Sequence, residues 1–125
     1  MGEAPDSRPP VWTGQVALRS SNTTAAARFY EQIGMRPVQV DEHFAVLEMR
    51  GGTHLAIRHD PEHVAPGPAP WDLMADDLDA IHDKWQAQGL AVSPIMGGPP
   101  HRSFEVTDPD GHAITVRDSH VIGPV

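Results

Sequence analysis

The chain has 125 residues, and its 9 basic and 17 acidic side chains give it a formal net charge of −8 at pH 7. That length suits one compact domain with a single core, and the acidic balance argues against nucleic acid as a partner because no basic stripe exists to neutralise phosphates. The chain has no cysteine, so we expect neither disulfides nor cysteine-based zinc sites. It has no signal-peptide core and no apolar run long enough to span a membrane, so we expect a cytoplasmic protein that is not embedded in a membrane.

The first half of the chain opens with a tail, which a strand and a helix follow. Residues 1–11 are rich in proline and charge, so we expect them to be disordered. An extended run at 14–20 precedes Asn22, a strong N-cap residue, and the helical pattern that begins there stops at Gly34, which suits the left-handed position ending a helix. The apolar residues of this helix share one face: Ala26, Phe29 and Ile33. Three candidate strands follow, at 36–41, 43–49 and 53–58.

The second half repeats this order after a linker. The segment 61–70 contains several prolines and is predicted to be extended. Asp77 opens a second helical pattern that stops at Gly89, and its apolar stripe is Leu78, Ile81 and Trp85. Candidate strands lie at 71–75, 91–96, 102–107 and 112–117. The sequence therefore predicts one α+β domain at 12–120, with βαβββ modules at 12–60 and 71–120 and a C-terminal tail at 121–125.

Two segments give this repeat a family resemblance. Residues 27–35 (ARFYEQIGM) resemble the first module of the vicinal oxygen chelate superfamily, and residues 106–112 (VTDPDGH) resemble its second module. This superfamily holds glyoxalase I, extradiol dioxygenases, fosfomycin-resistance enzymes and bleomycin-resistance proteins. The resemblance covers roughly residues 14–118. It implies paired βαβββ modules whose mixed sheet curls around a shared concave pocket, commonly in a homodimer.

The resemblance also implies where a metal ion would bind. Metal-dependent members place one ligand at the start of each module's first strand and one on each module's last strand. On this chain those positions carry Gln15, Ala56, Pro70 and Thr115. The Gln15 amide is an acceptable ligand for a hard cation, but Ala56 and Pro70 offer no donor and Thr115 offers only a neutral hydroxyl. We therefore expect no metal at the usual place and no cofactor.

Strand alternation predicts which side chains line the pocket. If the four ligand positions face the pocket, the residues two places away on the same strands face it too. On these strands the predicted lining consists of Gln15, Arg19, His54, Arg58, Asp72, Met74, Thr115 and Arg117. Three residues of the remaining strands are predicted to join the wall: Phe44, Glu48 and Glu105. His54 is either a rim side chain in water or a polar or acid–base group of the pocket. Asp72 is either an exposed edge residue or a pocket anion paired with Arg19 or Arg117.

Three functions fit this pocket. The favoured one is a metal-free binder of small molecules, similar to the bleomycin-resistance proteins, that sequesters a drug or metabolite. The second is a metal-independent enzyme with Asp72, Glu48, Glu105 or His54 as its base. The third is a metal-dependent lyase, isomerase or dioxygenase whose site is rebuilt around Gln15 and a histidine. The sequence leaves turnover and the charge of the ligand open, because net acidity suits a cation whereas the predicted arginines suit an anion.

Overall fold

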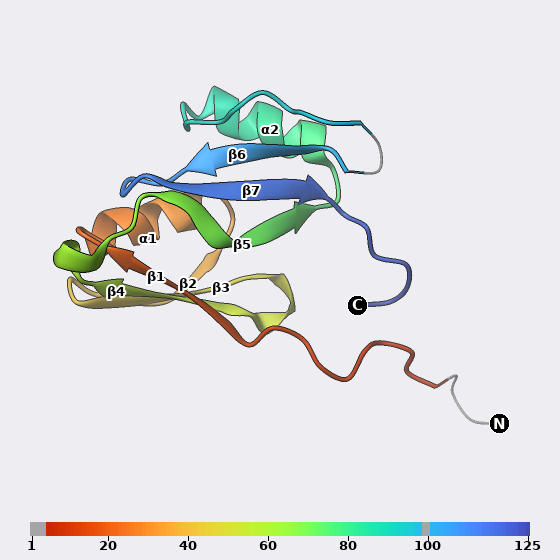
Figure 1. Cartoon of the computed structure of the whole chain (residues 1–125). Coiled ribbons are helices and arrows are strands. Elements are labelled where there is room, and N and C mark those ends of the chain that lie inside the picture. Colours follow the sequence, from red (N-terminus) through yellow and green to blue (C-terminus); the bar gives the residue numbers. More distant parts are fainter. Residues whose placement is uncertain (1–4, 99–100) are drawn as a thin grey trace.

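A computed structural model describes residues 5–98 and 101–125 of the chain (Figure 1). The first module forms sheet A, a four-stranded sheet in the order β1-β4-β3-β2. Its elements are β1 (Gln15–Ser20), α1 (Thr23–Gln32), β2 (Arg36–Val40), β3 (Phe44–Glu48) and β4 (His54–His59). β1 pairs with β4 in parallel, and β3 lies antiparallel to both β4 and β2. Short 3₁₀ turns follow β3 and β4, at Arg50–Gly52 and Pro61–His63.

The second module forms sheet B, a three-stranded sheet in the order β5-β7-β6. Its elements are β5 (Gly67–Ala75), α2 (Leu78–Ala87), β6 (Ser103–Thr107) and β7 (His112–Asp118). β5 pairs with β7 in parallel, as β1 does with β4, so the two modules share their topology. The two mixed sheets with their helices confirm the predicted α+β class, and they do not close into a barrel (Figure 1).

Both helices begin and end where the sequence predicts. The Asn22 side chain accepts a hydrogen bond from the Ala25 N–H at 3.1 Å, and the Asp77 side chain accepts one from the Ala80 N–H at 3.0 Å. These caps satisfy N–H groups that a helix leaves free at its start. Past the helix ends, Gly34 has a φ of 115°, a conformation that glycine adopts at little cost.

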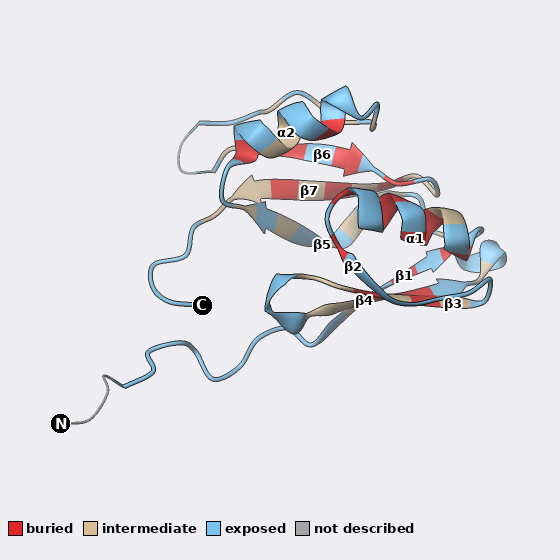
Figure 2. Ribbon diagram, turned by 180° about the vertical axis from the view of Figure 1, so that it is seen from behind, coloured by how far each residue is buried: buried red, intermediate tan, exposed pale blue. Residues whose placement is uncertain are grey.

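One hydrophobic core joins the two modules. Its largest fully buried apolar side chains come from both sheets and both helices: Tyr30, Leu47, Leu55, Ile57, Leu78, Phe104, Val106, Ile114 and Val116. Helix α1 packs on the apolar face of sheet A and also reaches sheet B, where Tyr30 lies 6.3 Å from Trp71 between ring centroids. Figure 2 shows buried residues on the helices and on strands of both sheets, where they alternate with more exposed ones. The opposite face of each sheet is therefore turned outward.

Two predicted segments differ in the structure. Residues 91–96 form no strand, and only isolated bridges join Val92 to Val106 and Met96 to Ser103. Pro94 between these bridges has no N–H to donate, which explains the interruption. Conversely, β5 begins at Gly67, so the end of the predicted linker is already part of a strand.

That longer strand is possible because β5 is an edge strand, where prolines are tolerated. It pairs only with β7 among the described strands, and its register is irregular between Pro68 and Asp72. At the N-terminus, residues 5–11 form no helix or strand, and the rest of the predicted tail, residues 1–4, lies outside the described residues. Neither helix of the described chain is long and apolar enough to cross a membrane.

Candidate functional site

The outward face of sheet A carries three rows of side chains, which the strand register defines. The first row runs from β1 across β4 and β3 to β2 as Gln15, His54, Glu48 and Arg36. The middle row is Ala17, Ala56, Val46 and Gln39. The third row is Arg19, Arg58 and Phe44. The structure thus brings six of the predicted pocket residues onto one face, with a floor of short apolar side chains between two polar ends.

The first row is held together by a shared carboxylate. Glu48 lies 3.0 Å from the His54 Nε2 atom through one oxygen and accepts a hydrogen bond from Arg36 through the other. The hydrogen bond from Arg36, with that from His54, holds the pKa of Glu48 below its usual range. Glu48 therefore stays ionised and fixes the imidazole on the open face of the sheet. This arrangement favours the reading of His54 as an oriented polar group.

The third row places two arginines, Arg19 and Arg58, next to each other in the register of β1 and β4. Arg19 has Asp60 within 3.5 Å, and Asp60 also bonds to His63 at 2.8 Å. Within the described residues, Arg58 has no ion-pair partner. This end of the face is consequently positive, although the chain as a whole is acidic.

The outward face of sheet B carries the other predicted residues. Thr115 on β7 lies between Asp72 on β5 and Glu105 on β6, and Arg117 is next to Met74. Arg117 donates a hydrogen bond to Asp72 at 2.8 Å, so Asp72 pairs with Arg117, one of its two predicted partners. A shallow depression of about 370 Å³ opens on this face, lined by Ala69, Pro70, Trp71, Asp72, Thr115 and Arg117.

The four positions where metal-dependent relatives place ligands lie on these two faces. On sheet A, Gln15 is next to His54 and Ala56 is next to Ala17. On sheet B, Thr115 is next to Asp72, and Pro70 precedes Asp72 by two residues. Since Ala56 and Pro70 have no donor atoms, these positions do not fit a divalent ion. Both faces turn away from the common core, so the two halves of this set do not face each other within one chain.

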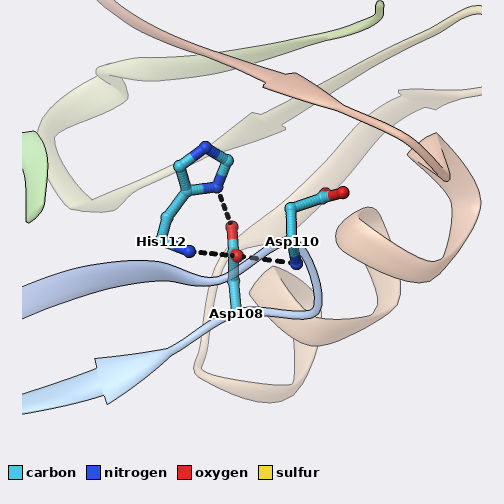
Figure 3. Close-up of side chains that lie close together, drawn as sticks. All are labelled: Asp108, Asp110 and His112. Atoms are coloured by element: carbon cyan, nitrogen blue, oxygen red, sulfur yellow. Dashed lines mark hydrogen bonds and ion pairs between the residues drawn. The ribbon is translucent and has the colours of Figure 1, made fainter. Parts of the chain in front are cut away.

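A separate cluster of potential metal ligands lies in the β6–β7 turn (Figure 3). The ligand atoms of Asp108, Asp110 and His112 lie within 4.8 Å of one another. Protein groups already occupy them: Asp108 accepts hydrogen bonds from His112 Nδ1 and from Tyr30, each at 2.7 Å. Asp110 accepts from the hydroxyls of Ser20 and Ser21. The cluster therefore ties the second module to the first and does not form an open metal site.

The sequence identified this DPDG turn as part of the family resemblance but did not predict the contacts that the turn makes with the first module. It also missed a second hollow, of about 240 Å³, at the start of α1. That hollow is lined by Ser21, Asn22, Thr23, Thr24, Glu42, His43 and His59. No spacing in the sequence connects these segments, since the fold alone brings them together.

Comparisons with known proteins agree with this architecture. Residues 12–116 match the sequence profile of the Glyoxalase/Bleomycin resistance protein/Dioxygenase superfamily, whereas no curated protein matches the sequence. Lactoylglutathione lyase from Agrobacterium tumefaciens superposes with a TM-score of 0.74 at 22% identity, over 92% of this chain and 98% of that one. TnmS3, an antibiotic binding protein from Streptomyces sp. CB03234, gives 0.72 at 25% identity, over 86% and 95%.

A bleomycin-binding protein complexed with bleomycin is also similar, with a TM-score of 0.67 at 20% identity over 88% of this chain and 99% of that one. At such identities the superpositions show the fold alone. The profile match shows the family, because it spans most of the chain. The chain belongs to the Glyoxalase/Bleomycin resistance protein/Dioxygenase superfamily.

Proposed function

We propose that this protein binds a small molecule without a metal at the superfamily's usual place, and that it sequesters a drug or metabolite. One observation carries the proposal. The two sheet faces are open and polar, yet two of the four positions at which relatives bind a metal, Ala56 and Pro70, have no side-chain donor atom. A concave surface with an apolar floor and a few fixed polar groups is what a small organic ligand needs. The antibiotic-binding and bleomycin-binding proteins among the similar structures support this reading.

The proposal includes a homodimer. One copy presents half of the predicted lining on sheet A and half on sheet B, facing different directions, so a second copy is needed to bring two unlike halves together. In a two-fold dimer, sheet A of one copy could face sheet B of the other, which gives two equivalent sites. Large apolar side chains exposed in the single chain support such an interface: Trp12 at 69%, Val38 at 57%, Val40 at 44% and Met74 at 44%.

A metal-independent enzyme is the second candidate, and one contact favours it. Glu48 holds the His54 ring at 3.0 Å on the open face, which is how a carboxylate orients a histidine that accepts or donates protons. His54 would then act on a bound substrate, whereas in a binder it serves as a hydrogen-bonding anchor. Conversion of a bound molecule to a product would identify an enzyme, whereas binding without conversion would identify a binder.

Three measurements on the same preparation test the function. Sedimentation equilibrium should give a dimer, and a monomer at all concentrations would remove the shared site. Calorimetric titration with a panel of small organic molecules that includes bleomycin should show binding of at least one of them, and formation of lactoylglutathione should be absent. Metal content after soaking in Zn, Ni, Mn and Fe(II) should stay well below one equivalent. Near one equivalent, lost in Gln15→Ala, would assign the protein to the metal-dependent class. The cytoplasmic location expected from the sequence stays a prediction.

A further inference from the structure

The polar face of sheet A has an arginine-rich end, where Asp60 pairs with Arg19 and also attracts Arg58 electrostatically. Arg19 and Arg58 are partners in the parallel register of β1 and β4, and neighbouring strands hold such partners about 5 Å apart. One carboxylate, Asp60, serves both Arg19 and His63, at 3.5 and 2.8 Å. Two arginines on neighbouring strands outnumber the single carboxylate beside them, so a further anion is attracted to this end of the face.

An apolar strip leads away from this end. Phe44 is the antiparallel partner of Arg58, so an aromatic ring flanks the guanidinium group. The next row begins with the short apolar side chains Ala17, Ala56 and Val46 and ends at the polar Gln39 on β2. Short side chains leave space above the sheet for a flat molecule, and apolar ones favour rings over sugars or peptides.

The far end of the strip presents a hydrogen-bond acceptor. Glu48 and His54 lie in the first row, and His54 precedes Arg58 by four residues on β4. At the rise of a β-strand this separates the two ends by about 13 Å. The hydrogen bond from Arg36 keeps the pKa of Glu48 low, so this end accepts hydrogen bonds from a hydroxyl or amine.

We propose that this face binds an elongated aromatic acid, whose carboxylate lies between Arg19 and Arg58 and whose far end donates a hydrogen bond to the Glu48–His54 pair. The inference rests on the proposed small-molecule-binding function and names the ligand class of that site. Arginine is suited to this role because its planar fork binds carboxylates through two parallel hydrogen bonds. The net charge of −8 repels an anion only at long range, and salt screens that repulsion.

The test uses four biphenyl probes of one shape on the full chain. They are 4′-hydroxybiphenyl-4-carboxylic acid, biphenyl-4-carboxylic acid, 4-hydroxybiphenyl and 4′-hydroxybiphenyl-4-carboxamidine. Calorimetric titration should rank the hydroxy acid first, with the amidine weakest because the same arginines repel it. The hydroxy acid should bind about tenfold more weakly to Arg58→Gln, the loss expected of one charge-assisted hydrogen bond. Arg28→Gln, the same change at an exposed position of α1, should leave the affinity unchanged.

The outcomes separate this inference from the proposed function. If neutral or cationic probes bind best and Arg58→Gln changes nothing, the anionic class is wrong while the small-molecule-binding function stands. If Arg58→Gln abolishes the dimer, Arg58 belongs to the interface and the inference fails. If a folded dimer binds none of the four probes, the inference fails, while the titrations described for the proposed function still decide whether the protein binds small molecules. Glu48→Gln should weaken binding of the hydroxy acid and leave the affinity for biphenyl-4-carboxylic acid unchanged. This result would show that the hydroxyl end of the ligand lies at Glu48.

Discussion

Tyr30 of α1 donates a 2.7 Å hydrogen bond to Asp108, which lies 78 residues further along the chain in the β6–β7 turn. The Tyr30 side chain is fully buried and Asp108 nearly so. Burial and the neighbouring Asp108 carboxylate raise the pKa of Tyr30 far above its usual range, so its hydroxyl remains a donor at every pH at which the protein is folded. Since Asp108 also accepts from His112, this one carboxylate connects the two modules.

The first prediction follows from that contact. Tyr30→Phe removes one donor from a buried carboxylate and should lower the free energy of unfolding by about 1–3 kcal/mol, the cost of leaving a buried polar group short of a partner. Urea unfolding at pH 7 measures the loss. Removal of an exposed hydroxyl in Thr24→Ala, at the start of the same helix, is the control and should cost less. A Tyr30→Phe variant as stable as the parent would mean that the contact contributes nothing.

Acid stability should depend on Asp110. Burial alone would raise the pKa of this carboxyl group, but hydrogen bonds from Ser20 and Ser21 outweigh it, and the pKa in the folded protein is lowered. A lowered folded-state pKa contributes stability above the unfolded value of about 3.9, and this contribution disappears as the pH falls through the folded pKa. Asp110→Asn should therefore destabilise the protein at pH 7 and show a smaller further loss between pH 5 and 3 than the parent.

Urea midpoints at a series of pH values provide the measurement. The matched control is Glu31→Gln, which removes a charge from an exposed position of α1 and should preserve the parent's acid dependence. Equal slopes for Asp110→Asn and the parent below pH 5 would show that the serine hydrogen bonds do not stabilise the ionised carboxylate.

The helices, their caps and most strands could be predicted because local physics determines them. Asn22 and Asp77 cap their helices through contacts within three residues, and alternation separates the buried Leu55 and Ile57 from their outward neighbours. The strand predicted at 91–96 was wrong, because the apolar residues of this segment suggested a strand that Pro94 interrupts.

The candidate site could be predicted only in outline. Alternation assigns side chains to a face but does not say which acid pairs with which base. The sequence left Arg19 and Arg117 as alternative partners of Asp72, whereas in the structure Asp72 pairs with Arg117, and Arg19 pairs with Asp60. Arg58 differs from the other two through contacts between strands that are distant in sequence. Such contacts need the folded chain.

Glu48 should titrate differently once Arg36 is removed. Hydrogen bonds from Arg36 first and His54 second lower its pKa, so Arg36→Ala should raise the pKa of Glu48 towards its ordinary value. Carboxyl ¹³C chemical shifts followed between pH 2 and 7 measure this directly. Stability should hardly change, because the Arg36 side chain is exposed and water screens the pair. An unchanged Glu48 titration would show that Arg36 does not contact it in solution.

Installing donors at the degenerate positions should create a metal site. Ala56→Glu, Pro70→His and Thr115→Glu, made together with Gln15 retained, supply two carboxylates, an imidazole and an amide, a set that suits divalent ions. Because Gln15 and Ala56 lie on sheet A while Pro70 and Thr115 lie on sheet B, and the faces of one chain diverge, the four donors converge only between two copies. Calorimetry with Ni²⁺ and Zn²⁺ should therefore show about one ion per chain in the dimeric variant and none in the parent. Variants carrying the sheet A change alone or the sheet B changes alone should bind weakly, because each leaves an incomplete set. Tight binding by a monomeric triple variant would contradict the outward orientation of the two faces.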